Sequence, residues 1–202
     1  MAYIGTQPND VKKNTGLYTP SEILQLTKDG SWGGSLELIQ SQSVSGATTC
    51  NFTSIKENIY DVHLLQLDDM ESGSDMYSEI RLSNDSGSSY ETSNYQRAVQ
   101  YGGTNGTFGE NRTTSADRFS ILNFSTANEP HSLYVYLYNL GSSSKYSYIT
   151  HQAPPSPLWT YFGGGVYSVA ETINAIQILN SAGASFTGGT AKLYGVKKIW
   201  VT

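Results

Sequence analysis

Hydrophobic and polar side chains alternate with a period of two along most of the chain, which is the pattern of half-buried β-strands. In one such run Val62 and Leu64 alternate with Asp61 and His63, so His63 is expected on the solvent side. Numerous short strands joined by turn residues predict an all-β sandwich or barrel. The predicted strands, each closed by Gly, Ser or Asn, lie at residues 35–42, 60–64, 76–82, 95–101, 118–124, 132–139, 146–151, 173–179 and 190–196.

Helix and loop signals are fewer. A helix is predicted to begin at Thr19, which can serve as its N-cap because Glu22 follows three residues later, and to end at Gly30. The run Gly163–Gly165 is interpreted as a flexible loop, and the glycines of residues 102–115 make that stretch the most mobile one. Loops rich in Gly, Ser, Asn, Asp or Pro are expected at residues 68–75, 84–93, 102–115, 141–145 and 153–157.

The first 18 residues differ from the rest of the chain. They are polar, contain Pro8 and Gly16 and show no period, so they predict an extended N-terminal arm. Fully extended, the arm would reach on the order of 60 Å, and it is expected to be disordered or laid on a neighbour. Residues 19–202 then form a single β-sandwich domain, because all-β domains commonly use this whole length.

Composition excludes several classes of protein. The chain carries 12 Lys and Arg against 17 Asp and Glu, a net charge of -5, and is not expected to bind nucleic acid. It contains no run of 18 apolar residues and shows no secretory signal at its start, so neither membrane insertion nor export is expected. The single Cys50 excludes an internal disulfide, fits a reducing compartment and is expected to be a small buried side chain.

Candidate catalytic and metal-binding residues are scattered. The chain has no Gly-x-Ser-x-Gly elbow, and His63, His131 and His151 are isolated; the first two are expected at the surface or hydrogen-bonded, His131 in a turn. The acidic stretch 68–75 offers oxygen ligands for calcium but lacks the Asp-x-Asn-x-Asp-Gly spacing, so it is expected to be solvated. Glycoside hydrolysis needs two carboxylates about 5 to 9 Å apart, and no strand carries such a pair on one face. We therefore expect no enzyme, no cofactor and no metal.

The aromatic pattern is the most informative feature. Residues 133–138 place Leu133, Val135 and Leu137 on one face of a strand and three tyrosines on the other. The tyrosine side is covered by another part of the same chain, or it contacts a neighbouring subunit or sugar rings, since tyrosine combines apolar area with a hydrogen-bonding tip. The predicted contact residues, including those expected at loop edges, are Tyr95, Tyr101, Tyr134, Tyr136, Tyr138, Trp159 and Tyr161.

Several sequence segments resemble those of virion structural proteins of tailed bacteriophages, most closely those of marine and cyanobacterial phages. They are Phe52-Thr53-Ser54-Ile55 followed by Tyr60-Asp61-Val62-His63, the run Ile80 to Gly87, Ile176-Gln177-Ile178, and Ser185 to Val196. The opening Met-Ala-Tyr-Ile-Gly is matched as well. The similarity covers about residues 45–198, and the apolar end at residues 198–202 departs from it.

This resemblance implies a jelly-roll-like antiparallel β-sandwich on a virion assembled in the host cytoplasm, commonly as a homo-oligomeric trimer. The expected function is that of a tail-fibre or appendage protein whose exposed loops contact the host surface, with other virion proteins and a host-surface glycan as partners. One alternative is a capsid decoration (cement) protein that clamps head subunits through its arm; a glycan depolymerase is the other. The arm residues expected to anchor the chain to the particle are Tyr3, Ile4, Pro8, Lys12 and Lys13.

Overall fold

The computed structural model describes residues 19–28, 35–74, 76–124, 129–153, 159–181 and 183–197. The chain divides into two compact units, Met1–Ser35 and Leu36–Thr202, so the expected boundary between residues 18 and 19 lies inside the first unit. Helix α2 (Pro20–Lys28) belongs to this first unit, and its predicted start is confirmed. The Thr19 Oγ1 accepts a hydrogen bond from the Glu22 amide at 3.3 Å, and Glu22 Oε2 accepts one from the Thr19 amide at 2.7 Å, which is a capping box.

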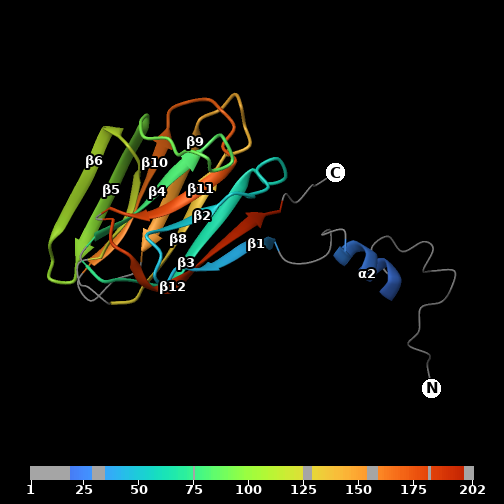
Figure 1. The fold of residues 1–202 in the computed structure, drawn as a ribbon, viewed down its shortest axis with the longest axis horizontal. Helices are drawn as coiled ribbons and strands as arrows, with labels where there is room; N and C mark the ends of the chain where they lie inside the picture. Colours follow the sequence, from blue (N-terminus) through green and yellow to red (C-terminus); the bar gives the residue numbers. More distant parts are fainter. Residues whose placement is uncertain are drawn as a thin grey trace, which may run out of the picture. The chain divides into compact units, whose positions relative to one another are not determined.

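The second unit is an all-β, antiparallel sandwich, and the predicted fold class is confirmed at that level. Its two sheets form separate layers in Figure 1, with β6 and β1 at the two edges of the larger one. The larger sheet has the order β1 (Leu36–Ser43), β12 (Phe186–Val196), β3 (Val62–Ser72), β8 (His131–Tyr138), β9 (Ser147–Ala153), β10 (Trp159–Tyr167), β5 (Tyr95–Gly103), β6 (Phe108–Ala116). The smaller sheet has the order β2 (Thr49–Phe52), β11 (Ala175–Asn180), β4 (Met76–Ser83), β7 (Phe119–Phe124).

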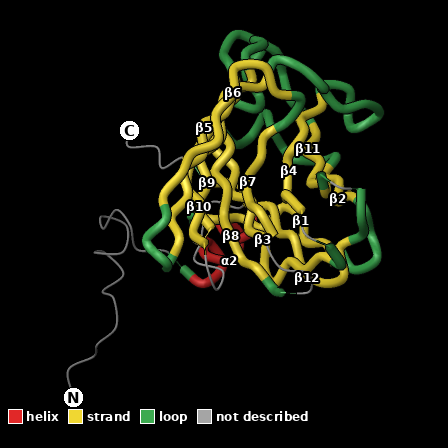
Figure 2. Tube along the Cα trace, turned by 90° about the vertical axis from the view of Figure 1, so that its left-hand side faces the viewer, coloured by secondary structure: helices red, strands yellow, loops and turns green. Residues whose placement is uncertain are grey.

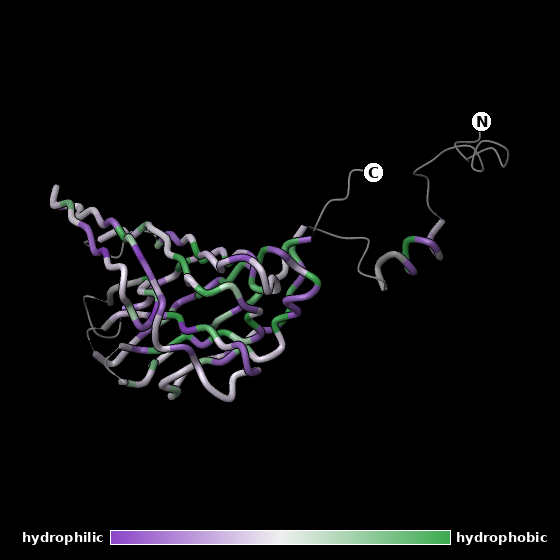
Figure 3. The backbone as a smooth tube through the Cα atoms, turned by 90° about the horizontal axis from the view of Figure 1, so that it is seen from above, coloured by the Kyte–Doolittle hydropathy of each residue, from purple (hydrophilic) through white to green (hydrophobic). Residues whose placement is uncertain are grey.

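The core lies between the two sheets and is built by the alternation that the sequence displays. In β8, Leu133, Val135 and Leu137 are buried, and across the core Ile80 and Leu82 of β4 are completely buried. Figure 3 shows hydrophobic residues gathered along the middle of this unit. Neighbouring strands within a sheet often come from distant parts of the chain, as β2 and β11 do in the smaller sheet and β3 and β12 in the larger one. Each sheet is therefore held together by long-range strand pairing and not by hairpins alone.

Strand β3 differs from the sequence-based prediction in its length and in the orientation of its faces. It runs on to Ser72, so most of the acidic stretch expected as a loop at residues 68–75 is strand, with a register shift between Leu67 and Met70 that accommodates it. The faces of its first half are also reversed: His63, Leu65 and Leu67 are buried, whereas Val62 and Leu64 lie on the other side. The expectation that His63 faces solvent was therefore wrong, because both faces of this strand carry apolar residues and alternation alone cannot orient it.

Two glycine-rich stretches are strands rather than flexible loops. Residues 102–115 contain the end of β5 and nearly all of β6, joined by a turn at residues 104–107. Gly163–Gly165 lie in the middle of β10, where glycine is required by close approach: a Cβ on Gly165 would lie 2.7 Å from the Phe119 ring. Glycine here provides space for a neighbour instead of mobility.

The longer described loops gather at one end of the strands, toward the top of Figure 2. The expected loop after β4 is present, and two residues tie it to the segment between β10 and β11: Asn84 Nδ2 donates to Glu171 Oε2 at 2.8 Å, and Asn174 Nδ2 donates to the Asn84 carbonyl at 3.1 Å. The expected loop at residues 141–145 is also present. In the part of the chain that is described, no helix has the length and apolar character needed to cross a bilayer.

Candidate binding surfaces

The outer side of the larger sheet carries a surface that we call the tyrosine face: Tyr134, Tyr136 and Tyr138 of β8, Tyr148 of β9 and Phe162 of β10. The predicted alternation of β8 is confirmed, since its three tyrosines lie opposite the buried Leu133, Val135 and Leu137. Strand register places Tyr138 beside Tyr148, and Tyr136 beside Thr150. The side chains of Tyr134, Tyr148 and Phe162 are 40%, 43% and 46% exposed. The face therefore presents aromatic rings to solvent within the described chain.

Neighbouring rings hold the tyrosine face in a fixed arrangement. The rings of Tyr136 and Tyr138 stack with centroids 6.4 Å apart, and those of Tyr134 and Tyr136 meet edge to face at 5.9 Å. The Tyr134 hydroxyl donates a 2.6 Å hydrogen bond to Oε1 of Gln152 on the adjacent strand. Such contacts restrict the rotamers of the rings before any partner arrives, which lowers the entropy lost on binding.

Charge is absent from the centre of this surface. Strands β8, β9 and β10 contribute Tyr, Thr, Gln, Phe, Gly and Val to it. The ionic groups lie toward its two margins, where Lys192 Nζ is 2.7 Å from Asp68 Oδ2 and Arg112 Nε is 3.2 Å from Glu110 Oε1. Depletion of charge and enrichment in tyrosine are what distinguish the core of a protein interface from ordinary surface.

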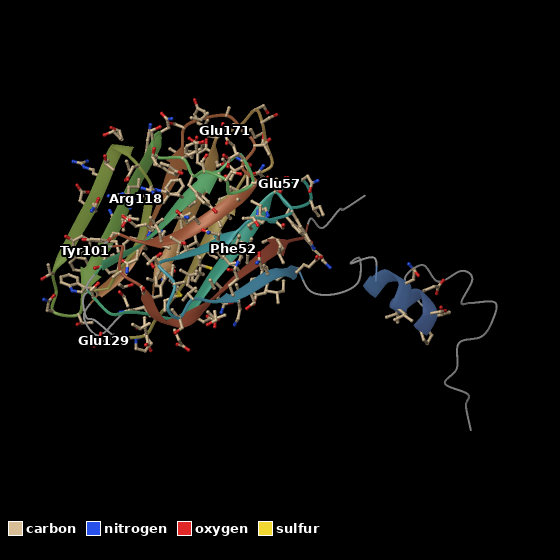
Figure 4. The ribbon with its side chains drawn as sticks, viewed as in Figure 1. Phe52, Glu57, Tyr101, Arg118, Glu129 and Glu171 are labelled. Atoms are coloured by element: carbon tan, nitrogen blue, oxygen red, sulfur yellow. The ribbon has the colours of Figure 1, made fainter. Side chains whose placement is uncertain are left out.

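A second surface is a cavity of about 300 Å³, which we call the aromatic pocket. It lies where β5, β6 and β10 of the larger sheet meet β4 and β7 of the smaller one, on the side of the sandwich where Figure 4 labels Tyr101. The Tyr101 ring is 5.6 Å from that of Trp159 and 5.8 Å from that of Tyr161. The lining residues are Tyr77, Val99, Tyr101, Glu110, Asn111, Ser120, Ile121, Trp159 and Tyr161.

Glycines seat two of these rings against the sheet. A Cβ on Gly109 would clash with the Tyr101 side chain, and a Cβ on Gly103 would lie 2.9 Å from the Trp159 ring. Each ring therefore covers a glycine of the β5–β6 hairpin, and no larger residue could replace it without moving the ring. The glycines that the sequence presents as loop residues thus position the pocket's aromatic side chains.

The predicted contact residues fall into three groups. Tyr134, Tyr136 and Tyr138 share the tyrosine face, and Tyr101, Trp159 and Tyr161 share the pocket, where Tyr161 is 7% exposed. Tyr95 was wrongly placed at a loop edge. It is completely buried, its ring packs 4.8 Å from that of Phe119, and its hydroxyl accepts a 2.9 Å hydrogen bond from the Leu82 amide. Tyr95 is a core residue, and the five anchoring residues expected in the arm lie outside the described residues.

Sequence reasoning missed several residues of these surfaces. Tyr148 could have been identified, because alternation in the strand predicted at residues 146–151 puts it on the opposite face from Ile149, which is buried. Phe162 could not, since the glycines that follow it obscure the alternation of its strand. Tyr77 of β4 and Asn111 of β6 meet at the pocket because the smaller sheet packs on the larger one, which no local pattern encodes.

The three histidines are buried rather than exposed. His63 Nε2 lies 2.8 Å from the Ile55 carbonyl, and desolvation lowers its pKa and that of His131, which begins β8 instead of lying in a turn. Burial lowers the pKa of His151 to about 4, and neither of its ring nitrogens has a hydrogen-bond partner among the described residues. These side chains are neutral at neutral pH and face the sandwich interior.

Two carboxylates meet on one arginine. Arg118 donates to Glu79 Oε2 at 3.0 Å and to Asp117 Oδ2, and Arg81 donates to the same Asp117 oxygen at 3.1 Å. The hydrogen bond from Arg118 lowers the pKa of Asp117 to about 2, whereas desolvation raises that of Glu79. Because one guanidinium is bonded to both carboxylates, it occupies the space between them that a scissile glycosidic bond would need.

The remaining candidates are Cys50 and the side chains that could bind a metal ion. Cys50 is buried as predicted, and desolvation raises the pKa of its thiol to about 11. Over the residues that are described, no group of three or more His, Cys, Asp or Glu side chains could hold a metal ion. Comparison of the chain with protein-family models, with curated proteins and with solved structures finds no match.

Proposed function

We propose that this chain is a structural protein of a tailed-bacteriophage particle, a tail-fibre or appendage protein that works by binding and contacts the host surface. In this proposal copies of the chain associate through the tyrosine face into a closed homo-oligomer, and a trimer is favoured by the resemblance to phage virion proteins. The observation that carries the proposal is the tyrosine face, the tyrosine-rich part of the larger sheet's outer side on which β8, β9 and β10 place no charged side chain.

The composition of the face supports a second copy as its occupant. A chain with a net charge of -5 repels its own copies wherever acidic groups meet, so self-association favours the surface from which charge is missing. Tyrosine provides apolar area with a hydrogen-bonding tip, which suits an interface between subunits that must also remain soluble before assembly.

The dimensions of the face also suit an interface between subunits. The three strands that carry the face, at a spacing of about 4.8 Å and with about five residues of about 3.3 Å each, give a flat area on the order of 240 Å², before side-chain relief is counted. Each partner of a standard stable interface contributes about 800 Å². The tyrosine face can therefore form the centre of a subunit contact, and the neighbouring strands of the larger sheet would provide the rest.

Sedimentation of the full chain tests this proposal. The wild-type protein is expected near 66 kDa, three times the 22.0 kDa chain, at micromolar concentrations. The double variant Tyr136→Ser/Tyr138→Ser loses two stacked rings and is expected to shift toward the monomer. Tyr146→Ser is the control, because this tyrosine is exposed but lies in the loop before β9, outside the tyrosine face. A monomeric wild type, or a double variant that assembles as well as the wild type, would contradict the proposal.

A further inference from the structure

We infer that the aromatic pocket is a binding site for one uncharged sugar residue, with Trp159 and Tyr101 as the stacking side chains and Asn111 as the polar contact. The inference rests on the host-contact part of the proposed function and deepens it by naming the ligand class and the site. It involves a different part of the sandwich from the tyrosine face, so the two can be tested separately.

The aromatic side chains supply the first requirement of such a site. A pyranose presents a face of C–H groups, which packs well on an aromatic ring because the ring's π-face is the negative end of its quadrupole. Tyr101 and Trp159 stand at 78° to each other with centroids 5.6 Å apart, so together they form two walls of a corner. Gly109 and Gly103 hold these rings against the sheet, which makes the corner rigid before the ligand arrives.

Polar groups at the pocket supply the second requirement. Register pairs Asn111 of β6 with Val99 of β5, whose buried side chain lies on the inner side of the sheet, so the Asn111 side chain lies on that side too. An amide offers one acceptor and two donors, which matches neighbouring hydroxyls of a sugar. Ser120 and Tyr77 contribute hydroxyls from the smaller sheet. The lining is polar and apolar in similar measure, and a small number of well-placed polar groups is what orients a ligand in such a site.

Charge and size narrow the ligand to a neutral one of about one ring. Among the lining residues Glu110 is the charged one, and its carboxylate is engaged by Arg112 at 3.2 Å. With no cation among the described lining residues and a chain of net negative charge around it, the pocket offers nothing to a carboxylated or sulfated sugar. Its volume of about 300 Å³ lies at the lower end of the range for ligand sites, enough for a monosaccharide residue.

The experiment uses the full chain labelled with 5-fluorotryptophan and follows its ¹⁹F resonances. The chain has three tryptophans, and Trp159→Phe identifies the resonance at the pocket. Glucose, galactose, mannose and N-acetylglucosamine are titrated at millimolar concentrations, with glucuronate as the anionic comparison. At least one neutral sugar is expected to shift the Trp159 resonance in a saturable manner, and glucuronate is expected to leave it unchanged.

Substitutions at neighbouring positions of β6 sharpen the test. Asn111→Leu removes the amide at an exposed position and is expected to weaken binding about tenfold, a loss of about 1.4 kcal/mol. Thr114→Leu is the matched control, since Thr114 is also exposed on β6 but does not line the pocket, and it is expected to bind as the wild type does.

The result that overturns the inference is the absence of any saturable shift at Trp159 with all four neutral sugars, or equal binding by Asn111→Leu and wild type. The Tyr136→Ser/Tyr138→Ser protein is expected to bind sugar normally. If sugar binding fails while the wild type still assembles, this inference falls and the proposed assembly role stands.

Discussion

Replacement of His151 by leucine should remove a large part of the acid sensitivity of this fold. His151 lies on the inner side of β9, paired with Val135 and Gly163 of the neighbouring strands, and its side chain is buried. Burial lowers its pKa to about 4, against 6.5 for an exposed imidazole. The unfolded chain therefore binds a proton at a higher pH than the folded protein does, so stability falls as the pH decreases from about 6.5 toward 4.

The magnitude follows from the two pKa values. Proton linkage with values of 6.5 and about 4 gives a loss of about 2 kcal/mol in the free energy of unfolding between pH 7 and pH 5. The full difference, reached below pH 4, is about 3 kcal/mol. At pH 7 His151→Leu should be at least as stable as the wild type, because both imidazole nitrogens lack a hydrogen-bond partner among the described residues.

Urea denaturation at pH 7 and pH 5, followed by tryptophan fluorescence, measures this difference. His63 and His131 also have lowered pKa values, and they act in the same direction in both proteins, so their contribution cancels in the comparison. The wild type should lose about 2 kcal/mol more than His151→Leu over this pH range. If both proteins lose the same amount, the reasoning that places a neutral, desolvated imidazole in the core is refuted.

Three further predictions concern the packing of the sandwich. Gly165→Ala should destabilise it by about 1 to 3 kcal/mol in urea because its Cβ would enter an aromatic ring of β7, whereas Gly73→Ala, where the nearest atom is at 3.5 Å, should change little. Arg118→Met should lower the free energy of unfolding by about 3 kcal/mol at pH 7, because it leaves Glu79 buried without its partner. This loss should become smaller as the pH falls toward 4.5 and Glu79 binds a proton, and a loss independent of pH would argue against the reasoning. Cys50 should resist a thiol reagent at pH 8 until denaturant is added, and rapid labelling of the native protein would show that it is not buried.

Alternation along the sequence predicted the strands with one apolar face well and the others poorly. Strand β8 was predicted on both its faces, since its leucines and valine alternate with tyrosines and only one arrangement buries the former. Strand β6 escaped prediction because its side chains are mostly exposed: it is held by pairing with β5, and an edge strand without a buried face needs no hydrophobic period. Strand β10 was hidden by glycines whose role is to admit neighbouring groups.

The sequence predicted which aromatic residues contribute to the candidate site, but not that they lie together. Tyr101, Trp159 and Tyr161 were singled out as aromatic contact residues, yet their convergence depends on the register of β10 against β5, which pairs Tyr161 with Tyr101 and Trp159 with Gly103. Tyr95 belongs to the same strand as Tyr101 and is a core residue, because it packs against Phe119 and bonds to the Leu82 amide of the smaller sheet, whereas Tyr101 borders the cavity between the sheets. The placement of one sheet over another is a property of the whole fold.

The central claim is that the tyrosine face is covered by another copy of the chain, and hydroxyl-radical footprinting of the native protein tests it most directly. Within one chain Tyr134, Tyr148 and Tyr146 are 40%, 43% and 45% exposed, so in a monomer hydroxyl radicals would oxidise all three at similar rates. Tyr134 and Tyr148 belong to the face and Tyr146 does not. The account predicts that both face tyrosines are protected severalfold relative to Tyr146 at micromolar concentration and that protection disappears on dilution; equal oxidation of the three at every concentration would contradict it.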